Sequence, residues 1–131
     1  MRRTVVLAFV ADVLLVVVFA AIGRASHDEG ILGPGGLGLL QTCWPFLVAL
    51  VLGWLATRGW RRPLAPLRTG LGVWATTVIV GMVLRALSGQ GVVLAFVIVA
   101  SVTLLVLLVG WRAITALVAR AARTRRARRE R

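Results

Sequence analysis

The chain has 131 residues, of which 60% are hydrophobic and 15% are charged, and its mean hydropathy is +0.94. Globular proteins contain about 45 to 50% apolar residues. A soluble chain of this length needs a larger polar exterior than four acids and sixteen bases provide. The composition therefore excludes a water-soluble protein and indicates an integral membrane protein, and the single cysteine excludes a disulfide-bonded scaffold.

Four apolar segments are each long enough to cross a bilayer. A hydrocarbon core about 30 Å thick requires about 20 helical residues. Backbone groups find no water there, and the segments are too long and too uniformly apolar to be strands of a membrane barrel. We therefore predict an all-α, integral membrane four-helix bundle with short loops and a basic C-terminal helical extension. The predicted spans are residues 4–22, 37–57, 69–87 and 92–110, within a transmembrane domain at 1–112 and followed by a basic cytoplasmic tail at 113–131.

The first span follows Arg2 and Arg3, as the core of a secretory signal does. It is longer than a signal core of about 7 to 15 residues, it contains Asp12, and no small-x-small cleavage site precedes Gly23. We therefore expect an uncleaved span.

Pro45 lies inside the second span, where it removes a helix hydrogen bond. Two arrangements fit this position. Either the helix is kinked at Pro45, or residues 37–42 form an irregular lead-in and Pro45 occupies the first helical turn. The lead-in is slightly preferred.

The basic residues are all arginine, and fourteen of the sixteen lie at the N-terminus, between the second and third spans, or from Arg112 onward. Arg24 and Arg85 are the two on the opposite side. Arginines near span ends stay in the cytoplasm, so we predict a multi-pass protein of the bacterial cytoplasmic (inner) membrane with both termini cytoplasmic.

Tryptophan side chains prefer the boundary between membrane and water. Trp60 and Trp111 are expected at the inner boundary and Trp44 at the outer one, whereas Trp54 and Trp74 lie deeper and are assigned no role.

The basic tail predicts contact with anionic phospholipid. A polybasic run beside a span gains about 1 kcal/mol per residue against an anionic leaflet, and we expect this rather than contact with nucleic acid. Apolar residues from Trp111 to Ala121 recur at helical spacing, so the fourth helix is expected to continue with one face on the lipid surface. The arginines concerned are Arg120, Arg123, Arg125, Arg126, Arg128 and Arg129.

Asp12 lies in the middle of the first span, where a carboxylate costs about 2.5 to 3.5 kcal/mol on insertion scales. Counting 1.5 Å per residue from the inner ends places it level with hydroxyl groups of the third and fourth spans. We predict that its carboxyl group faces the bundle interior and bonds the hydroxyl of Thr77 or Thr76, with Ser101 or Thr103 as the second candidate. The predicted intramembrane polar layer comprises Asp12, Thr76, Thr77, Ser101 and Thr103.

The third span carries small and polar residues at steps of three and four, which place them on one face of a helix. Such a face allows helices to approach closely, and packing alone is a sufficient explanation. The residues are Gly70, Trp74, Thr77, Gly81, Arg85 and Ser88.

An outer-face polar cluster is predicted from the first and third loops, with Arg85 pairing with Asp28 or Glu29. His27 has an ordinary pKa near 6.5 and is expected to be a solvated loop histidine rather than a proton relay. Adjacent side chains do not converge easily on one ion, so no metal site is predicted. Cys43 is expected to be an apolar filler and not a nucleophile. The cluster comprises Arg24, His27, Asp28, Glu29 and Arg85.

Several short motifs occur in an order and spacing that resemble one family. They are Asp12, Gly23-Arg24-Ala25-Ser26-His27, Trp44-Pro45-Phe46, Gly53-Trp54, Arg61-Arg62-Pro63, Gly81 with Arg85, and Gly110-Trp111-Arg112. On these the chain resembles the domain of unknown function (DUF) 3054 family of small four-span bacterial membrane proteins, over residues 5–112. The resemblance implies the four-span fold and assigns no activity.

Three classes of function fit these features. We expect a non-enzymatic membrane component or accessory subunit, in a homo-oligomer or larger membrane complex, without a cofactor or catalytic residues. The alternative is a small transporter or proton-coupled channel in which Asp12 titrates. The third is an outer-face membrane enzyme acting through the outer-face polar cluster, which ranks last because the sequence has no nucleophile-base pair and no metal spacing.

Overall fold

The computed structural model describes residues 1–26 and 30–131, and within them the secondary structure is helical, with no strand. Four of its helices are long and apolar enough to cross a membrane, which confirms the predicted all-α four-helix bundle and identifies a multi-pass membrane protein. The long helices are α1 (Arg2–Ser26), α2 (Gly38–Thr57), α3 (Leu71–Leu87) and α4 (Leu94–Arg129). Short helical turns are η1 (Pro34–Gly36), η2 (Gly59–Arg61) and the π-helical turn η3 (Pro66–Gly70), which leads into α3.

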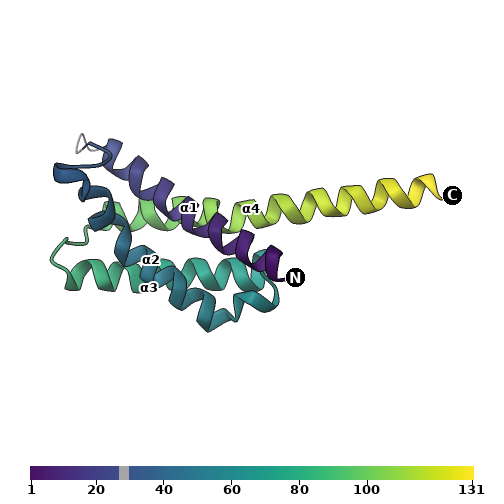
Figure 1. The fold of residues 1–131 in the computed structure, drawn as a ribbon, viewed down its shortest axis with the longest axis horizontal. Helices are drawn as coiled ribbons and strands as arrows, with labels where there is room; N and C mark the ends of the chain where they lie inside the picture. Colours follow the sequence, from purple (N-terminus) through teal and green to yellow (C-terminus); the bar gives the residue numbers. More distant parts are fainter. Residues whose placement is uncertain (27–29) are drawn as a thin grey trace.

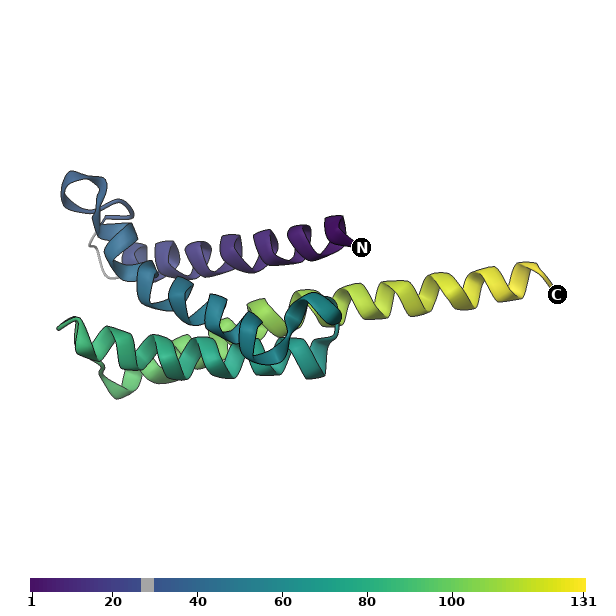
Figure 2. The ribbon, with the colours of Figure 1, turned by 60° about the horizontal axis from the view of Figure 1, so that its bottom comes forward.

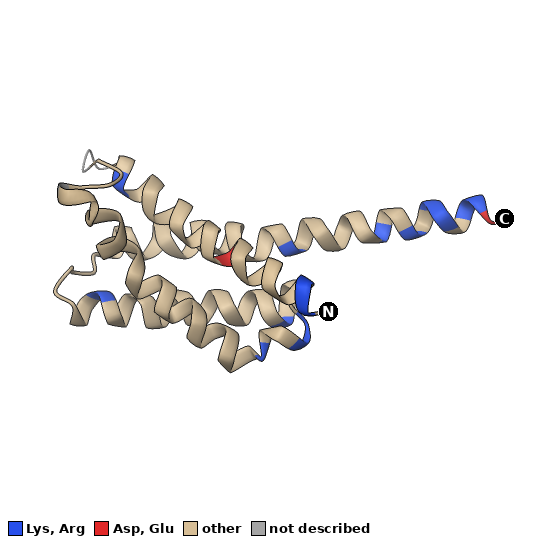
Figure 3. Ribbon diagram, in the orientation of Figure 1, with Lys and Arg blue, Asp and Glu red and all other residues tan. Residues whose placement is uncertain are grey.

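The bundle consists of α1, α2, α3 and the first part of α4, and the rest of α4 extends beyond it as a single rod (Figures 1 and 2). The N-terminus and the α2–α3 connection lie at the end from which this rod leaves the bundle. The α3–α4 hairpin and the α1–α2 connection lie at the opposite end. Figure 3 shows that basic residues gather at the first end and along the rod, so the two ends of the bundle differ in charge.

The bundle core is built from buried aromatic and branched side chains, with Phe46 fully enclosed between Phe19 and Phe96. The closest packing is between α2 and α3, where glycines replace side chains. A Cβ atom on Gly81 would lie 2.5 Å from the Phe46 ring, and one on Gly53 would lie 3.2 Å from the Val73 backbone. In lipid, burial of apolar side chains does not drive helices together. The van der Waals contacts made at such close approach supply the attraction between α2 and α3 instead.

The outer surface of the bundle is apolar. Large aliphatic side chains on α1 and α4, such as Leu14 and Val102, are more than half exposed. Continuous apolar surface of this kind is unfavourable in water and matches a surrounding of lipid tails.

Helix α2 runs without interruption through the buried Pro45, so the prediction of an irregular lead-in at residues 37–42 is wrong. Proline lacks the N–H that would bond the carbonyl four residues earlier, which is that of Gln41. The side-chain amide of Gln90, from the α3–α4 hairpin, donates to this carbonyl at 2.9 Å instead. A donor from a neighbouring element thus allows the helix to continue across the proline.

Candidate functional site

The Asp12 carboxylate lies inside the bundle with none of its surface exposed, and it accepts four hydrogen bonds. Its Oδ1 accepts from Trp111 Nε1 at 2.9 Å and from Arg112 Nη1 at 2.8 Å. Its Oδ2 accepts from Trp54 Nε1 at 2.9 Å and from Arg112 Nη2 at 2.6 Å. An ionised carboxylate offers about four acceptor positions, so this one is saturated.

Arg112 on α4 supplies the opposite charge and is also fully buried. Side chains on a helix lean toward its N-terminus, so Arg112 projects back along α4 into the bundle. Its Nη1 also donates to the carbonyl of Leu108 at 2.8 Å, and its Nε donates to the carbonyl of Pro63 at 2.9 Å. The guanidinium therefore joins the Asp12 carboxylate to α4 and to the α2–α3 connection.

Two indoles complete the site. Trp54 on α2 is buried and meets Phe9 of α1 edge to face, with ring centroids 5.4 Å apart. Trp111 on α4 lies beside the guanidinium, whose carbon is 4.7 Å from the ring centroid. An indole N–H is a donor only, so both rings complement the acceptor oxygens of the carboxylate. We call Asp12, Trp54, Trp111 and Arg112 the buried ion-pair site.

The predicted bond from Asp12 to a threonine or serine hydroxyl is wrong. Thr76 donates to the Gly72 carbonyl of its own helix at 2.9 Å, and the buried Thr77 hydroxyl has no hydrogen-bond partner among the described residues. Ser101 and Thr103 are half-buried on α4, and the Ser101 backbone carbonyl accepts from Trp74 Nε1 at 2.8 Å. Helix rise gives the depth of Cα atoms, whereas the long Arg112 side chain extends from its own level on α4 to the Asp12 carboxylate.

Sequence reasoning therefore missed Trp54, Trp111 and Arg112 as partners of the carboxylate. Arg112 was counted with the cytoplasmic arginines because it follows the fourth span. One signal was available, since Arg112 stands apart from the arginine run that begins at Arg120. A lone arginine between apolar residues is a candidate counterion for an acid in another span.

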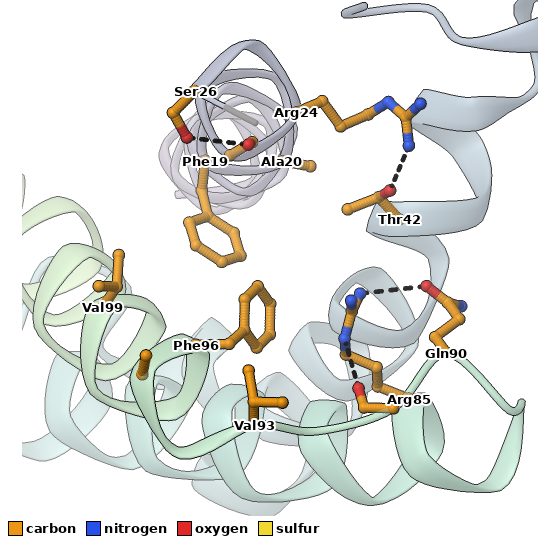
Figure 4. A pocket seen from close by; sticks show the side chains of 13 residues that line it. Phe19, Ala20, Arg24, Ser26, Thr42, Arg85, Gln90, Val93, Phe96 and Val99 are labelled. Carbon is orange, nitrogen blue, oxygen red and sulfur yellow. Dashed lines mark hydrogen bonds between the residues drawn. The ribbon is translucent and has the colours of Figure 1, made fainter. Parts of the chain in front are cut away.

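The outer-face polar cluster is described only in part, because His27, Asp28 and Glu29 lie outside the described residues. The predicted pairing of Arg85 with Asp28 or Glu29 lies outside them as well. Arg24 and Arg85 both line a cavity of about 380 Å³ at the end of the bundle away from the basic extension (Figure 4). Arg24 lies on α1 and Arg85 lies on α3, and the structure brings both side chains to the same cavity.

The sequence matches the family described as Protein of unknown function (DUF3054) over residues 9–115. The chain belongs to this family. No curated protein and no solved structure matches it. The matched region of the DUF3054 chain contains the whole buried ion-pair site and both cavity arginines, and it ends before the arginine run of the extension.

Proposed function

We propose that this DUF3054 protein is a non-enzymatic component of a bacterial cytoplasmic membrane, and that Asp12 holds its helices together instead of carrying protons. The observation that carries this proposal is the saturated carboxylate, with two donors on each oxygen. A carboxylate that relays protons needs an acceptor position open to the incoming proton. Here the acceptor positions are filled by an arginine and two indoles.

The proposed role as an accessory subunit rests on the basic extension. Six arginines between residues 120 and 129 are exposed on a helix that leaves the bundle (Figure 3). A charged rod of this kind is suited to contact with anionic headgroups or with an acidic face of a partner. We expect the protein to work in a homo-oligomer or a larger membrane complex.

For the orientation, we propose that both termini are cytoplasmic. Support comes from the arginines at the N-terminus, in the α2–α3 connection and along the extension, which share one end of the molecule (Figure 3). Arginine next to a span is retained on the cytoplasmic side.

Proton flux tests the role of Asp12. Full-length protein is reconstituted in liposomes that contain a pH-sensitive dye, and the decay of an imposed pH gradient is followed. We expect wild type, Asp12→Asn and the exposed control Arg126→Gln all to decay at the rate of protein-free liposomes. Flux in wild type that Asp12→Asn abolishes while circular dichroism shows it folded, and that Arg126→Gln retains, would establish the transporter alternative in place of this proposal.

The enzyme alternative has its own test. Membrane lipids are compared between cells that express wild type and cells that express His27→Ala at equal membrane levels. We expect identical lipid profiles. Loss of a lipid product in the variant would favour an outer-face enzyme.

Cysteine labelling tests the orientation. In a Cys43→Ala background, Ser88→Cys places a thiol in the α3–α4 hairpin and Thr124→Cys places one on the extension. An impermeant maleimide added to intact cells should label the first and spare the second. The reverse pattern would overturn the orientation.

Contact of the extension with lipid is tested with an environment-sensitive dye on Ala127→Cys, again in the Cys43→Ala background. In nanodiscs of phosphatidylglycerol we expect blue-shifted emission relative to phosphatidylcholine, and the shift should disappear at about 1 M salt, where the screening length falls to about 3 Å. Equal emission in the two lipids would contradict the predicted phospholipid contact.

A further inference from the structure

The α2–α3 connection, residues 58–70, packs against the buried ion-pair site at the end of the bundle from which the basic extension leaves (Figures 1 and 2). Gly59 is buried, and a Cβ atom added to it would lie 2.7 Å from the ring of Trp54. The Pro63 carbonyl accepts from Arg112 Nε at 2.9 Å, and a Cβ atom on Gly70 would lie 3.3 Å from Arg112 Cδ. The connection therefore contacts two members of the site directly.

The backbone of the connection is held by its own hydrogen bonds. It contains η2 and η3, and the buried Thr69 hydroxyl donates to the Arg62 carbonyl at 2.6 Å. Arg58 ends α2 in the left-handed conformation, with a φ of 51°, and its carbonyl accepts from the Arg61 N–H at 2.9 Å. The exposed side chains of the connection are thus carried by a fixed frame.

The exposed surface of the connection combines positive charge with apolar side chains. Its arginines are Arg58, Arg61, Arg62 and Arg68, all exposed. None of their side chains forms a hydrogen bond or an ion pair within the part of the chain that the structure describes. Trp60, Leu64 and Leu67 are 46%, 38% and 73% exposed. Guanidinium groups match phosphate oxygens, and tryptophan prefers the membrane boundary, so this surface is suited to lipid headgroups.

We propose that the exposed surface of the α2–α3 connection binds anionic phospholipid, and that the bound lipid stabilises the buried ion-pair site. The lipid phosphates lie against the arginines, and Trp60, Leu64 and Leu67 contact the upper part of the acyl chains. A free phosphate would use the arginines alone and leave these three apolar side chains in water.

The stabilisation follows from the difference between the folded and the unfolded connection. Only the folded connection holds the arginines and the apolar side chains on one short frame, and a ligand that prefers the folded state raises the unfolding temperature. Because this frame contacts Trp54 and Arg112, the lipid stabilises the ion-pair site with it. The proposal is independent of proton flux through Asp12, and the proposed orientation determines only that the lipid belongs to the cytoplasmic leaflet.

Three arginines of the connection can be replaced without loss of a side-chain bond among the described residues. Arg61→Gln, Arg62→Gln and Arg68→Gln together form the connection variant, which lowers the net charge by three. Arg58 is left unchanged because of its left-handed conformation.

The matched control removes the same charge from the basic extension. Arg123→Gln, Arg125→Gln and Arg128→Gln together form the extension variant, and these side chains are exposed on the rod beyond the bundle (Figure 3). No aromatic residue follows Trp111 in the sequence. Near-ultraviolet circular dichroism, which reports on aromatic side chains, therefore follows the bundle and not the extension.

The experiment measures thermal unfolding of the full-length protein by this signal, in detergent micelles that contain either phosphatidylglycerol or phosphatidylcholine. We expect wild type and the extension variant to unfold about 5 to 10 °C higher with phosphatidylglycerol than with phosphatidylcholine. The connection variant should unfold at the same temperature with either lipid. Its near-ultraviolet spectrum before heating verifies that it is folded.

Four outcomes overturn the proposal. They are equal unfolding temperatures of wild type in the two lipids, a rise that the connection variant retains, a rise that the extension variant loses, and an equal rise caused by millimolar inorganic phosphate with phosphatidylcholine, which would identify a phosphate site without a lipid. If the connection variant does not fold, Arg68→Gln alone takes its place. An undiminished rise in that single variant then overturns the proposal.

Discussion

Asp12 on α1 and Arg112 on α4 are 100 residues apart in the chain and form a bidentate ion pair, with N···O distances of 2.6 and 2.8 Å. Both side chains are fully buried. Each carries further bonds, from two indoles to the carboxylate and from the guanidinium to two carbonyls. One pair of residues thus joins α1, α2, α4 and the α2–α3 connection.

Removal of either charge is expected to destabilise the bundle strongly. Asp12→Asn or Arg112→Gln leaves the other charge buried without its counterion, which costs about 3 to 5 kcal/mol. The double variant should cost less than the sum of the two, because no charge is left alone. Unfolding in detergent, followed by circular dichroism, measures the cycle. Arg126→Gln serves as control, since its pair with Glu130 is exposed and should contribute nothing measurable. Additive effects of the two buried substitutions would contradict the coupling.

The two indoles are expected to contribute through their N–H groups. Trp54→Phe keeps most of the ring contact with Phe9 but removes a bond to a charged acceptor, at a cost of about 1.5 to 3 kcal/mol. Trp74→Phe is the matched control, because its N–H donates to a neutral backbone carbonyl and the loss should be about 0.5 to 1.5 kcal/mol. Both are measured by the same unfolding assay. Equal losses would mean that the charge of Asp12 adds nothing to the indole bond.

The bond from Gln90 to the Gln41 carbonyl is expected to matter chiefly because Pro45 has no N–H to bond that carbonyl. Gln90→Ala should destabilise the wild-type protein by about 0.5 to 1.5 kcal/mol. In a Pro45→Ala background, the new N–H can bond Gln41 within α2, so the loss from Gln90→Ala should shrink. A double-mutant cycle measures the difference. The same loss in both backgrounds would show that Gln90 acts through its bonds to Arg85 and Ser88 and not through Gln41.

Gly81 is expected to tolerate no side chain. A Cβ atom there would lie 2.5 Å from the ring of Phe46, which is itself enclosed on its other sides. Overpacking of this kind costs about 1 to 3 kcal/mol, so Gly81→Ala should unfold at a lower temperature than wild type. Gly110→Ala is the control in open space and should be neutral or stabilising by about 0.4 to 1 kcal/mol. Equal stability of the two variants would contradict close α2–α3 packing.

The sequence predicted the all-α four-helix bundle because each span satisfies the hydrogen-bonding requirement of lipid by itself. It also placed Gly81 on a face suited to close approach, and the structure puts that glycine against Phe46. These features depend on residues that are near in the chain or on one helix. The partners of Asp12 depend on the rotation of α1 against α2 and α4, which no local pattern records.

Two long side chains were the main source of error at the site. Arg112 was placed by its Cα position at the inner boundary, although its guanidinium extends toward Asp12 inside the bundle. Trp54 was assigned no role because it lies deeper than the membrane boundary, whereas in the structure its N–H donates to Asp12. The prediction of an irregular lead-in before Pro45 was wrong for a related reason. The donor that bonds the free Gln41 carbonyl comes from Gln90, far along the chain.

The order in which the helices are made gives the distant ion pair a consequence for biosynthesis. The ribosome adds Arg112 100 residues after Asp12, a delay of about 5 to 20 s at about 5 to 20 residues per second. During that interval the nascent first helix must hold its carboxylate without a counterion, or keep it near the lipid headgroups. A chain that stops before the end of the fourth helix therefore never gains the counterion of Asp12.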